Sequence, residues 1–179
     1  MPSEIWLPNL LLSIPRNPVT AVGVPMCLGL FSGWPSHGTL DSLWYKSLRH
    51  PPGRPGRFLP PLLWTVMYTC VGYASHLAVK HFDREALEGT PKRRALKRGL
   101  ALYYAQLGLN FIYTPIFLGA QQLGWSLVDS SLMTLTSFTM SSIFHKATGG
   151  STTYLLGPYC VWLVYATYMN GGLWWLNRE

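Results

Sequence analysis

The 179-residue sequence is poor in charge, and acidic side chains are the scarcest: it has seven Asp and Glu against fourteen Lys and Arg. Charged residues make up only 12% of the chain. Four long apolar segments contain a single carboxylate, Asp129. One such segment could be the core helix of a soluble protein, but four together argue against a soluble domain.

Cysteine is equally scarce and indicates neither a disulfide framework nor a metal site. Cys27, Cys70 and Cys160 lie inside apolar segments without paired spacing, so we interpret them as small packing residues. The sequence offers no acid–base or nucleophile combination for ordinary hydrolytic or transfer catalysis. It also has no internal repeat and no linker that would separate two domains. We therefore expect one domain that requires no metal or cofactor.

Four apolar segments are long enough to cross a bilayer, which takes about 20 helical residues. A fifth, residues 18–34, is shorter and would span only a thin membrane or tilt little. Asn17 can cap this fifth segment, where Pro18 fits the first helical position. Residues 1–17 are expected to be an interfacial or disordered lead-in. We predict an all-α membrane protein, with a five-transmembrane-helix domain over residues 18–178. The predicted spans are residues 18–34, 58–81, 96–118, 123–145 and 154–176.

The formal net charge of +7 is carried mainly by the connections between the spans. Basic loops beside a bilayer meet anionic headgroups, and no nucleic-acid-binding motif accompanies them. The expected partners are therefore membrane lipids and a hydrophobic ligand, with no nucleic acid. Counting Lys and Arg on the two sides leaves the orientation undecided.

The longest connection, residues 35–57, is expected to act as a lid because its prolines and glycines exclude a long helix. Trp44 and Tyr45 in its middle either anchor at the membrane interface or pack over a pocket mouth. The link at residues 119–122 is so short that the third and fourth spans must be antiparallel neighbours.

Aromatic and amide side chains recur at helical spacing within the spans. An amide is costly in hydrocarbon unless it faces protein, water or a ligand, so these faces should point inward. Hydrogen bonds between helices and contact with a ligand are both open for the amides. The residues are Trp64, Tyr68, Gln106, Asn110, Tyr113, Trp162, Tyr165 and Asn170.

Other polar residues of the spans have simpler expected roles. Asp129 should form a structural bond to a neighbouring helix near the membrane surface, with ligand contact as the alternative. His76 and His145 lack a paired motif, so we do not expect them to ligate haem. The many Ser and Thr residues of the fourth span favour close helix or dimer packing over a polar conduit.

Several tracts share their order and spacing with one known family. They are Trp44–Pro51 followed by Pro55, Trp64–Tyr73 with Tyr68 and Gly72 on one face, Gln106–Phe117, Gly119–Trp125 with Asp129, and Pro158–Trp162. Over Pro18–Arg178 the chain resembles the translocator protein family, also called tryptophan-rich sensory proteins or peripheral benzodiazepine receptors.

The resemblance implies a five-helix bundle with a central ligand cavity closed by the first loop. Members bind porphyrins including protoporphyrin IX, sterols, and isoquinoline or benzodiazepine drugs. They commonly form homodimers and, in eukaryotes, lie in the mitochondrial outer membrane, whereas a prokaryotic member would lie in the plasma membrane. The matching pocket positions are Trp64, Tyr68, Asn110, Tyr113, Trp125, Trp162, Tyr165 and Ala166.

Two departures from the family stand out. Phe111 and Tyr113 replace tryptophans that are common there, which can change the pocket's shape. Gly171 and Trp175 replace the tyrosine and arginine of a proposed sterol pattern, which puts sterol recognition through that face in doubt.

The expected function is a membrane receptor or carrier for porphyrin-like and other hydrophobic ligands, with protoporphyrin IX or haem as a ligand and not a cofactor. Arg49 and His50 are expected to meet porphyrin propionates. Two alternatives are a light- and oxygen-dependent porphyrin-degrading enzyme that uses Trp64 and Trp162, and a structural membrane adaptor. The expected gate residues are Trp44, Tyr45, Arg49, His50 and Pro51.

Overall fold

The computed structural model describes residues 7–33, 38–56 and 58–178, and this part of the chain contains helices and no strand. Trp34, Pro35 and Arg57, at the ends of the predicted first span and lid, lie outside the described residues. The elements are α1 (Asn9–Arg16), α2 (Pro18–Gly33), η2 (Thr39–Asp41), α3 (Leu43–Ser47), α4 (Leu59–Arg84), α5 (Pro91–Thr114), η3 (Pro115–Gly119), α6 (Leu123–Ala147) and α7 (Thr153–Leu176).

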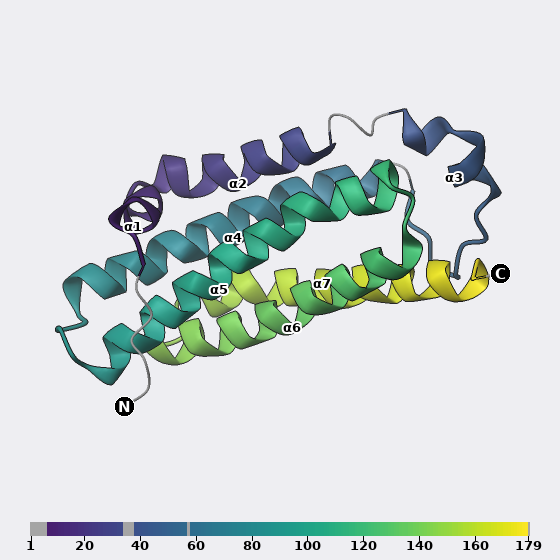
Figure 1. Cartoon of the computed structure of the whole chain (residues 1–179). Coiled ribbons are helices and arrows are strands. Elements are labelled where there is room, and N and C mark those ends of the chain that lie inside the picture. Colours follow the sequence, from purple (N-terminus) through teal and green to yellow (C-terminus); the bar gives the residue numbers. More distant parts are fainter. Residues whose placement is uncertain (1–6, 34–37, 57, 179) are drawn as a thin grey trace.

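The five longest helices, α2, α4, α5, α6 and α7, lie side by side along the molecule (Figure 1). α5 packs on α6, α6 on α7, and α2 on α4 and α5. The predicted antiparallel pairing of the third and fourth spans is confirmed, because α5 turns into α6 through η3. α3 and the C-terminal end of α7 lie at one end of the bundle, and α1 lies at the other (Figure 1).

The lead-in differs from the expectation, because its described part contains a docked helix. α1 buries Leu12 and Pro15 and packs on α2 and α4. The His76 ring nitrogen Nδ1 lies 2.8 Å from the Pro15 carbonyl oxygen, and Arg16 makes a two-pronged ion pair with Asp83. The amphipathic sequence of α1 gains more from covering α4 than from lying free. At the start of α2, the Asn17 carboxamide accepts from the Val19 amide at 2.8 Å, which confirms the predicted cap.

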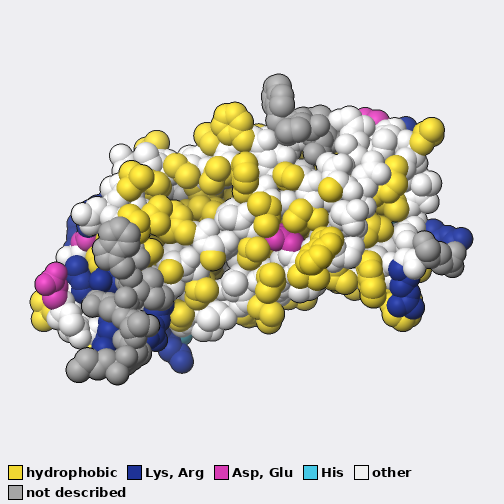
Figure 2. All heavy atoms as spheres, viewed as in Figure 1, with side chains coloured by type: hydrophobic (Ala, Val, Ile, Leu, Met, Phe, Trp, Pro, Cys, Tyr) yellow, Lys and Arg dark blue, Asp and Glu magenta, His cyan; other side chains and the backbone are white. Residues whose placement is uncertain are grey.

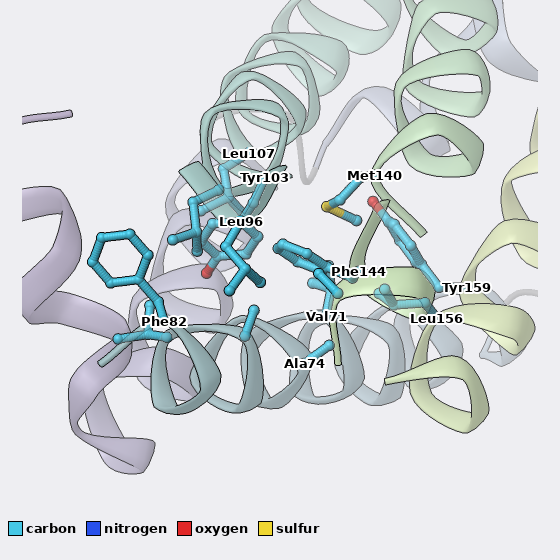
Figure 3. Packing of buried hydrophobic residues seen from close by; sticks show 14 of the residues in the cluster. Val71, Ala74, Phe82, Leu96, Tyr103, Leu107, Met140, Phe144, Leu156 and Tyr159 are labelled. Carbon is cyan, nitrogen blue, oxygen red and sulfur yellow. The ribbon is translucent and has the colours of Figure 1, made fainter. Parts of the chain in front are cut away.

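The core is built from residues of α4, α5, α6 and α7, with Leu12 of α1 added at one end. Figure 3 shows the Phe144 ring of α6 pointing between Leu96 of α5 and Val71 of α4, with Tyr159 beyond it. A methyl group on Gly99 would lie 2.3 Å from the Phe144 ring, so α5 approaches α6 closely only because this residue lacks a side chain.

Among the described helices, α4 alone is both long and apolar enough to cross a membrane by length and composition. α2 is apolar but has only 16 residues. Basic residues in the first turns of α5 lower its mean hydropathy, and in α6 and α7 hydroxyl, amide and aromatic side chains replace aliphatic ones. The prediction of five membrane spans is therefore not confirmed by this criterion.

On the outer surface, basic side chains are separated from most apolar ones. Figure 2 shows yellow hydrophobic side chains spread over the middle of the molecule and dark blue Lys and Arg gathered at its two ends. Many large apolar residues of the long helices are exposed, including Phe31, Leu62, Leu135 and Val161. A soluble monomer rarely exposes so much contiguous apolar surface.

Candidate functional site

Four aromatic side chains from α4 and α7 form one continuous group. The Trp64 and Trp162 rings meet edge to face at 6.1 Å between centroids. Trp64 contacts Tyr68 at 5.6 Å, and Trp162 contacts Tyr165 at 5.2 Å. The structure thus brings together four of the predicted site residues, at a spacing favourable for aromatic pairs.

A second aromatic group joins the first loop to the end of α5. Phe117 of η3 stacks on Tyr113 at 5.7 Å between centroids. The Trp44 and Tyr45 rings each meet Phe117 edge to face, at 6.3 and 6.4 Å. Trp44 and Tyr45 therefore pack on Phe117 at the end of the bundle, and both roles left open for them stay predictions. Phe117 was not among the predicted site residues.

Hydrogen bonds hold the loop against α7. The Tyr165 hydroxyl donates to the Gly53 carbonyl at 2.9 Å, and the Tyr168 hydroxyl donates to the Pro52 carbonyl at 3.1 Å. The Asn177 side chain accepts from the Arg49 amide and donates to its carbonyl, both at 2.9 Å. We call these four hydrogen bonds the loop latch.

Pro51 is buried beneath the loop latch and packs directly on α7. A Cβ atom at Gly172 would lie 2.5 Å from the Pro51 ring, so the absence of a side chain at Gly172 allows the contact. Sequence reasoning placed Pro51 in the gate but did not find Gly172, Tyr168 or Asn177, since contacts across 100 residues leave no local pattern.

The predicted amide pair on α5 is fully engaged inside the bundle. The Gln106 amide donates to the Tyr159 hydroxyl, and its carbonyl accepts from Thr136 at 2.8 Å. The Asn110 amide donates to the same Tyr159 hydroxyl at 3.1 Å and to the Gln106 carbonyl of the backbone at 2.9 Å. Hydrogen bonding between helices, one of the two open roles, is therefore present for both residues.

Tyr113, Asn170 and Ala166 form a smaller polar contact between α5 and α7. The Tyr113 hydroxyl donates to the Asn170 carbonyl of the side chain at 3.0 Å, and the Asn170 amide donates to the Ala166 backbone carbonyl at 2.9 Å. A ligand could reach these donors only by displacing the present partners.

Trp125 does not join the other predicted pocket residues. Its side chain is 66% exposed near the start of α6. One turn of helix further on, Asp129 is 4% exposed. Both carboxylate oxygens of Asp129 are buried without a hydrogen-bond partner among the described residues. The predicted structural bond from Asp129 to a neighbouring helix is therefore wrong.

The hydroxyl-rich face of α6 supports close packing of helices. Thr134 bonds to the Thr167 hydroxyl at 2.8 Å, and Thr167 donates to the Ser130 backbone carbonyl at 3.0 Å. Ser126 and Ser131 donate to backbone carbonyls one turn back in their own helix. These bonds satisfy hydroxyls within the bundle, as the preferred interpretation of this span requires.

The loop carries the charges that a ligand at this end would meet. Arg49 and Arg54 are exposed, and the Arg54 guanidinium lies 5.4 Å from the Tyr45 ring centroid. Burial, followed by the neighbouring Arg54 cation, lowers the pKa of His50. Neutral His50 is therefore a poorer partner for a propionate than either arginine.

The histidines and cysteines of the described residues do not form a group that could hold a metal ion. His76 is engaged with α1, and the His145 ring nitrogen Nδ1 lies 2.6 Å from the Thr153 hydroxyl.

The described residues form two surface pockets that stand out, and both lie at the end of the bundle opposite the loop. One, of about 350 Å³, is lined by residues of α1 and α4, including Arg16, Lys80 and Arg84. The other, of about 410 Å³, lies at the turn between α6 and α7. Neither includes the predicted pocket residues, so the central cavity stays a prediction.

Comparisons with known proteins give one consistent result. The family model described as the TspO/MBR family matches residues 21–176. The chain is similar to the translocator protein of Ovis aries, with 34% identity over 135 residues, covering 75% of each chain. It is 32% identical over 170 residues to the translocator protein homolog of Schizosaccharomyces pombe, covering 92% of this chain and 94% of that protein. A bacterial relative, the tryptophan-rich sensory protein of Cereibacter sphaeroides, is 30% identical over 128 residues, covering 71% and 72%.

Proposed function

Because this chain belongs to the TspO/MBR family of membrane proteins, we propose that it is a receptor or carrier that binds flat hydrophobic ligands between α4 and α7, beneath the loop of residues 38–56. Family membership supports a ligand-binding, transport or sensory role in a membrane.

The observation that carries the proposal is the aromatic group formed by Trp64, Tyr68, Trp162 and Tyr165 under a latched loop. Large rigid rings offer apolar surface at low entropic cost, and each ring pair adds about 0.5–1.5 kcal/mol beyond burial. A flat macrocycle would insert between these rings, replacing their mutual contacts with its own. Burial at about 25 cal/mol per Å² would drive binding before ordering costs.

Protoporphyrin IX is the proposed test ligand, and haem, isoquinolines and benzodiazepines belong to the same class of flat hydrophobic molecules. Arg49 and Arg54 would receive the propionates at the loop, where both guanidinium groups are exposed. Asn110 would donate to a ligand only after releasing Tyr159, so its ligand role is secondary in this proposal. Among the proposed ligands, sterols have the least support, because Gly171 and Trp175 depart from the sterol pattern of the family.

We further propose that α2, α4, α5, α6 and α7 all cross the bilayer, in the mitochondrial outer membrane or a bacterial plasma membrane, and that the protein is a homodimer. The apolar middle and charged ends of the surface support the crossing (Figure 2). The Gln106 carboxamide of α5 and the Thr134 and Thr136 hydroxyls of α6 are bonded inside the bundle, as a lipid environment favours.

Tryptophan-fluorescence quenching by protoporphyrin IX in lipid nanodiscs tests the proposed site. We expect saturable quenching in the wild type and a dissociation constant at least tenfold higher in a Trp64→Ala/Trp162→Ala double variant. Trp125→Ala is the matched control, since Trp125 lies outside the aromatic group and should leave the affinity unchanged. Quenching that does not saturate in the wild type would contradict the proposal and favour a structural adaptor.

Light- and oxygen-dependent breakdown of bound protoporphyrin is a second candidate, favoured by the direct contact of Trp64 with Trp162. Illumination of the purified complex in air should then yield a new tetrapyrrole product. Unchanged product and rate in Trp64→Phe would contradict this form of the enzyme.

A further inference from the structure

We propose that Asp129 is the recognition site for a basic nitrogen, so that the protein prefers hydrophobic amines to neutral molecules of the same shape. The inference rests on the proposed ligand site and adds to it a preferred ligand class. A ligand ammonium would pair with the Asp129 carboxylate; a neutral amine meeting the protonated acid would take its proton and form the same pair.

The first observation is that Asp129 is buried without a partner. The side chain is 4% exposed, and neither carboxylate oxygen has a hydrogen bond among the described residues. Buried polar groups are nearly always paired, because an unpaired one loses its hydration without compensation. A group left in this state is a candidate for pairing with something that arrives later.

The neighbours of Asp129 cannot supply the missing donors as they now stand. α6 packs against α7 so that Ser130 meets Thr167, and Leu127 lies 3.7 Å from a Cβ built on Gly171. This register puts Asp129 level with residues 168–169 of α7, next to Asn170. On the α5 side, the Tyr113 hydroxyl lies close enough to interact electrostatically with Asp129. Tyr113 donates to Asn170, and Asn170 donates to the Ala166 carbonyl, so both donors are directed elsewhere.

No basic residue of α6 lies near Asp129. The sequence has no Lys or Arg between Arg98 and Lys146, and Lys146 is 17 residues further along the same helix. At 1.5 Å per residue that is about 25 Å. The carboxylate therefore has no cation of its own helix within reach, and a cationic ligand group would meet no competitor there.

The place of Asp129 in the bundle connects it to the proposed ligand site. Tyr113, which interacts with Asp129, also stacks on Phe117. The Phe117 ring in turn contacts the rings of Trp44 and Tyr45 in the loop. A ligand entering beneath the loop would pass these rings before reaching Asp129. Arg49 and Arg54 attract anionic groups at the loop, and Asp129 attracts a cation inside the bundle. A bound ligand is therefore oriented with its carboxylates at the loop and its basic nitrogen toward Asp129.

The test compares two probes of one shape, 1-pyrenemethylamine and 1-methylpyrene, by quenching of tryptophan fluorescence in zwitterionic nanodiscs. Wild-type protein should bind the amine at least tenfold more tightly than the hydrocarbon. Asp129→Asn keeps the size of the side chain and should reduce this ratio to about one while leaving the affinity for 1-methylpyrene unchanged. The apparent affinity of each probe is compared between protein variants, so the partition of that probe into lipid affects both values equally and cancels.

Asp83→Asn is the matched control, because it removes one carboxylate at the far end of α4 and should leave the ratio unchanged. An unchanged ratio in Asp129→Asn, or equal affinity for both probes in the wild type, would overturn the inference while the proposed function stands. Failure of either probe to bind the wild type would also count against the proposed function. Should Asp129→Asn not fold, Asp129→Glu, which keeps the charge, must retain the preference.

Discussion

At the scale of single residues, the Tyr159 hydroxyl links two amide side chains of α5 inside the bundle. It accepts hydrogen bonds from the side-chain amides of Gln106 and Asn110, which lie one helical turn apart on α5. One side chain of α7 therefore binds two side chains of α5. Gln106 and Tyr159 are both fully buried, and such networks stabilise a particular register because every member is satisfied.

Tyr159→Phe should therefore lower the free energy of unfolding by about 1–3 kcal/mol, the usual cost of leaving a buried donor unpaired. Unfolding in detergent micelles, followed by circular dichroism, measures the change. Tyr154→Phe is the control, since Tyr154 is 89% exposed at the start of the same helix and should have no effect. Equal stability of the two variants would show that the network contributes nothing.

At the scale of elements, the loop of residues 38–56 is attached to α7 by side chains of α7 and not by its own secondary structure. α3 has only five residues, and no residue of it is buried. The latch of Tyr165, Tyr168 and Asn177, with Pro51 against Gly172, supplies the attachment. Loop opening thus depends on a few separable hydrogen bonds.

A Tyr165→Phe/Tyr168→Phe double variant should open the loop more often, since each hydrogen bond contributes about 0.5–1.5 kcal/mol. We expect hydrogen exchange of the backbone amides over residues 48–56 to be about tenfold faster, and bound protoporphyrin to leave faster. Tyr73→Phe, on an exposed part of α4, is the control. Unaltered exchange would mean that packing of Pro51 alone keeps the loop closed.

The turn from α4 to α5 adds a pH-dependent element. Hydrogen bonds from Lys92 and then from His81 lower the pKa of Glu85 to about 2, although Glu85 lies at the surface. A carboxylate with a lowered folded-state pKa stabilises the protein above its unfolded pKa, and this contribution is lost as the pH falls through the folded value.

The thermal midpoint of the wild type falls as the pH is lowered from 4.5 to 2, and in Glu85→Gln this fall should be slightly smaller. Thermal scans of the wild type and the variant at several pH values measure it, with Glu88→Gln as the control on the same turn. A wild-type curve parallel to that of Glu85→Gln throughout this range would contradict the assignment.

At the scale of the whole molecule, Lys and Arg gather at the two ends of the bundle and apolar side chains cover most of the middle, where acidic atoms also show (Figure 2). The end that carries the loop presents Arg49 and Arg54, and the opposite end presents the basic first turns of α5. A ligand approaching the loop end in the proposed way therefore meets cations before it meets aromatic rings.

An Arg49→Gln/Arg54→Gln variant should weaken binding of protoporphyrin IX about tenfold and leave an uncharged isoquinoline unaffected. Quenching titrations at low salt measure both affinities, since exposed charges are screened by salt. Arg178→Gln removes an exposed cation at the same end without altering the loop and serves as the control. Equal loss for both ligands would mean that the arginines support the loop and do not recognise carboxylates.

Residue patterns along the chain were sufficient for helices over the five apolar segments, the antiparallel turn from α5 to α6, the cap at Asn17 and the inward face of Gln106 and Asn110, but not for α1 or α3. Each of these depends on neighbours within a few residues, or on the cost of a lone amide in an apolar segment. The contact of Trp64 with Trp162 required the family resemblance, because the two residues lie on different helices.

The sequence by itself determined that this is a helical chain with an apolar middle, because hydrophobic length and helical spacing are local properties. Only the tertiary structure decided that Trp125 faces outward, that α1 docks on α4, that Tyr165 and Tyr168 hold the loop, and that Asp129 is buried without a partner. Those outcomes depend on which helix lies opposite each side chain, and that choice is made by packing over the whole bundle.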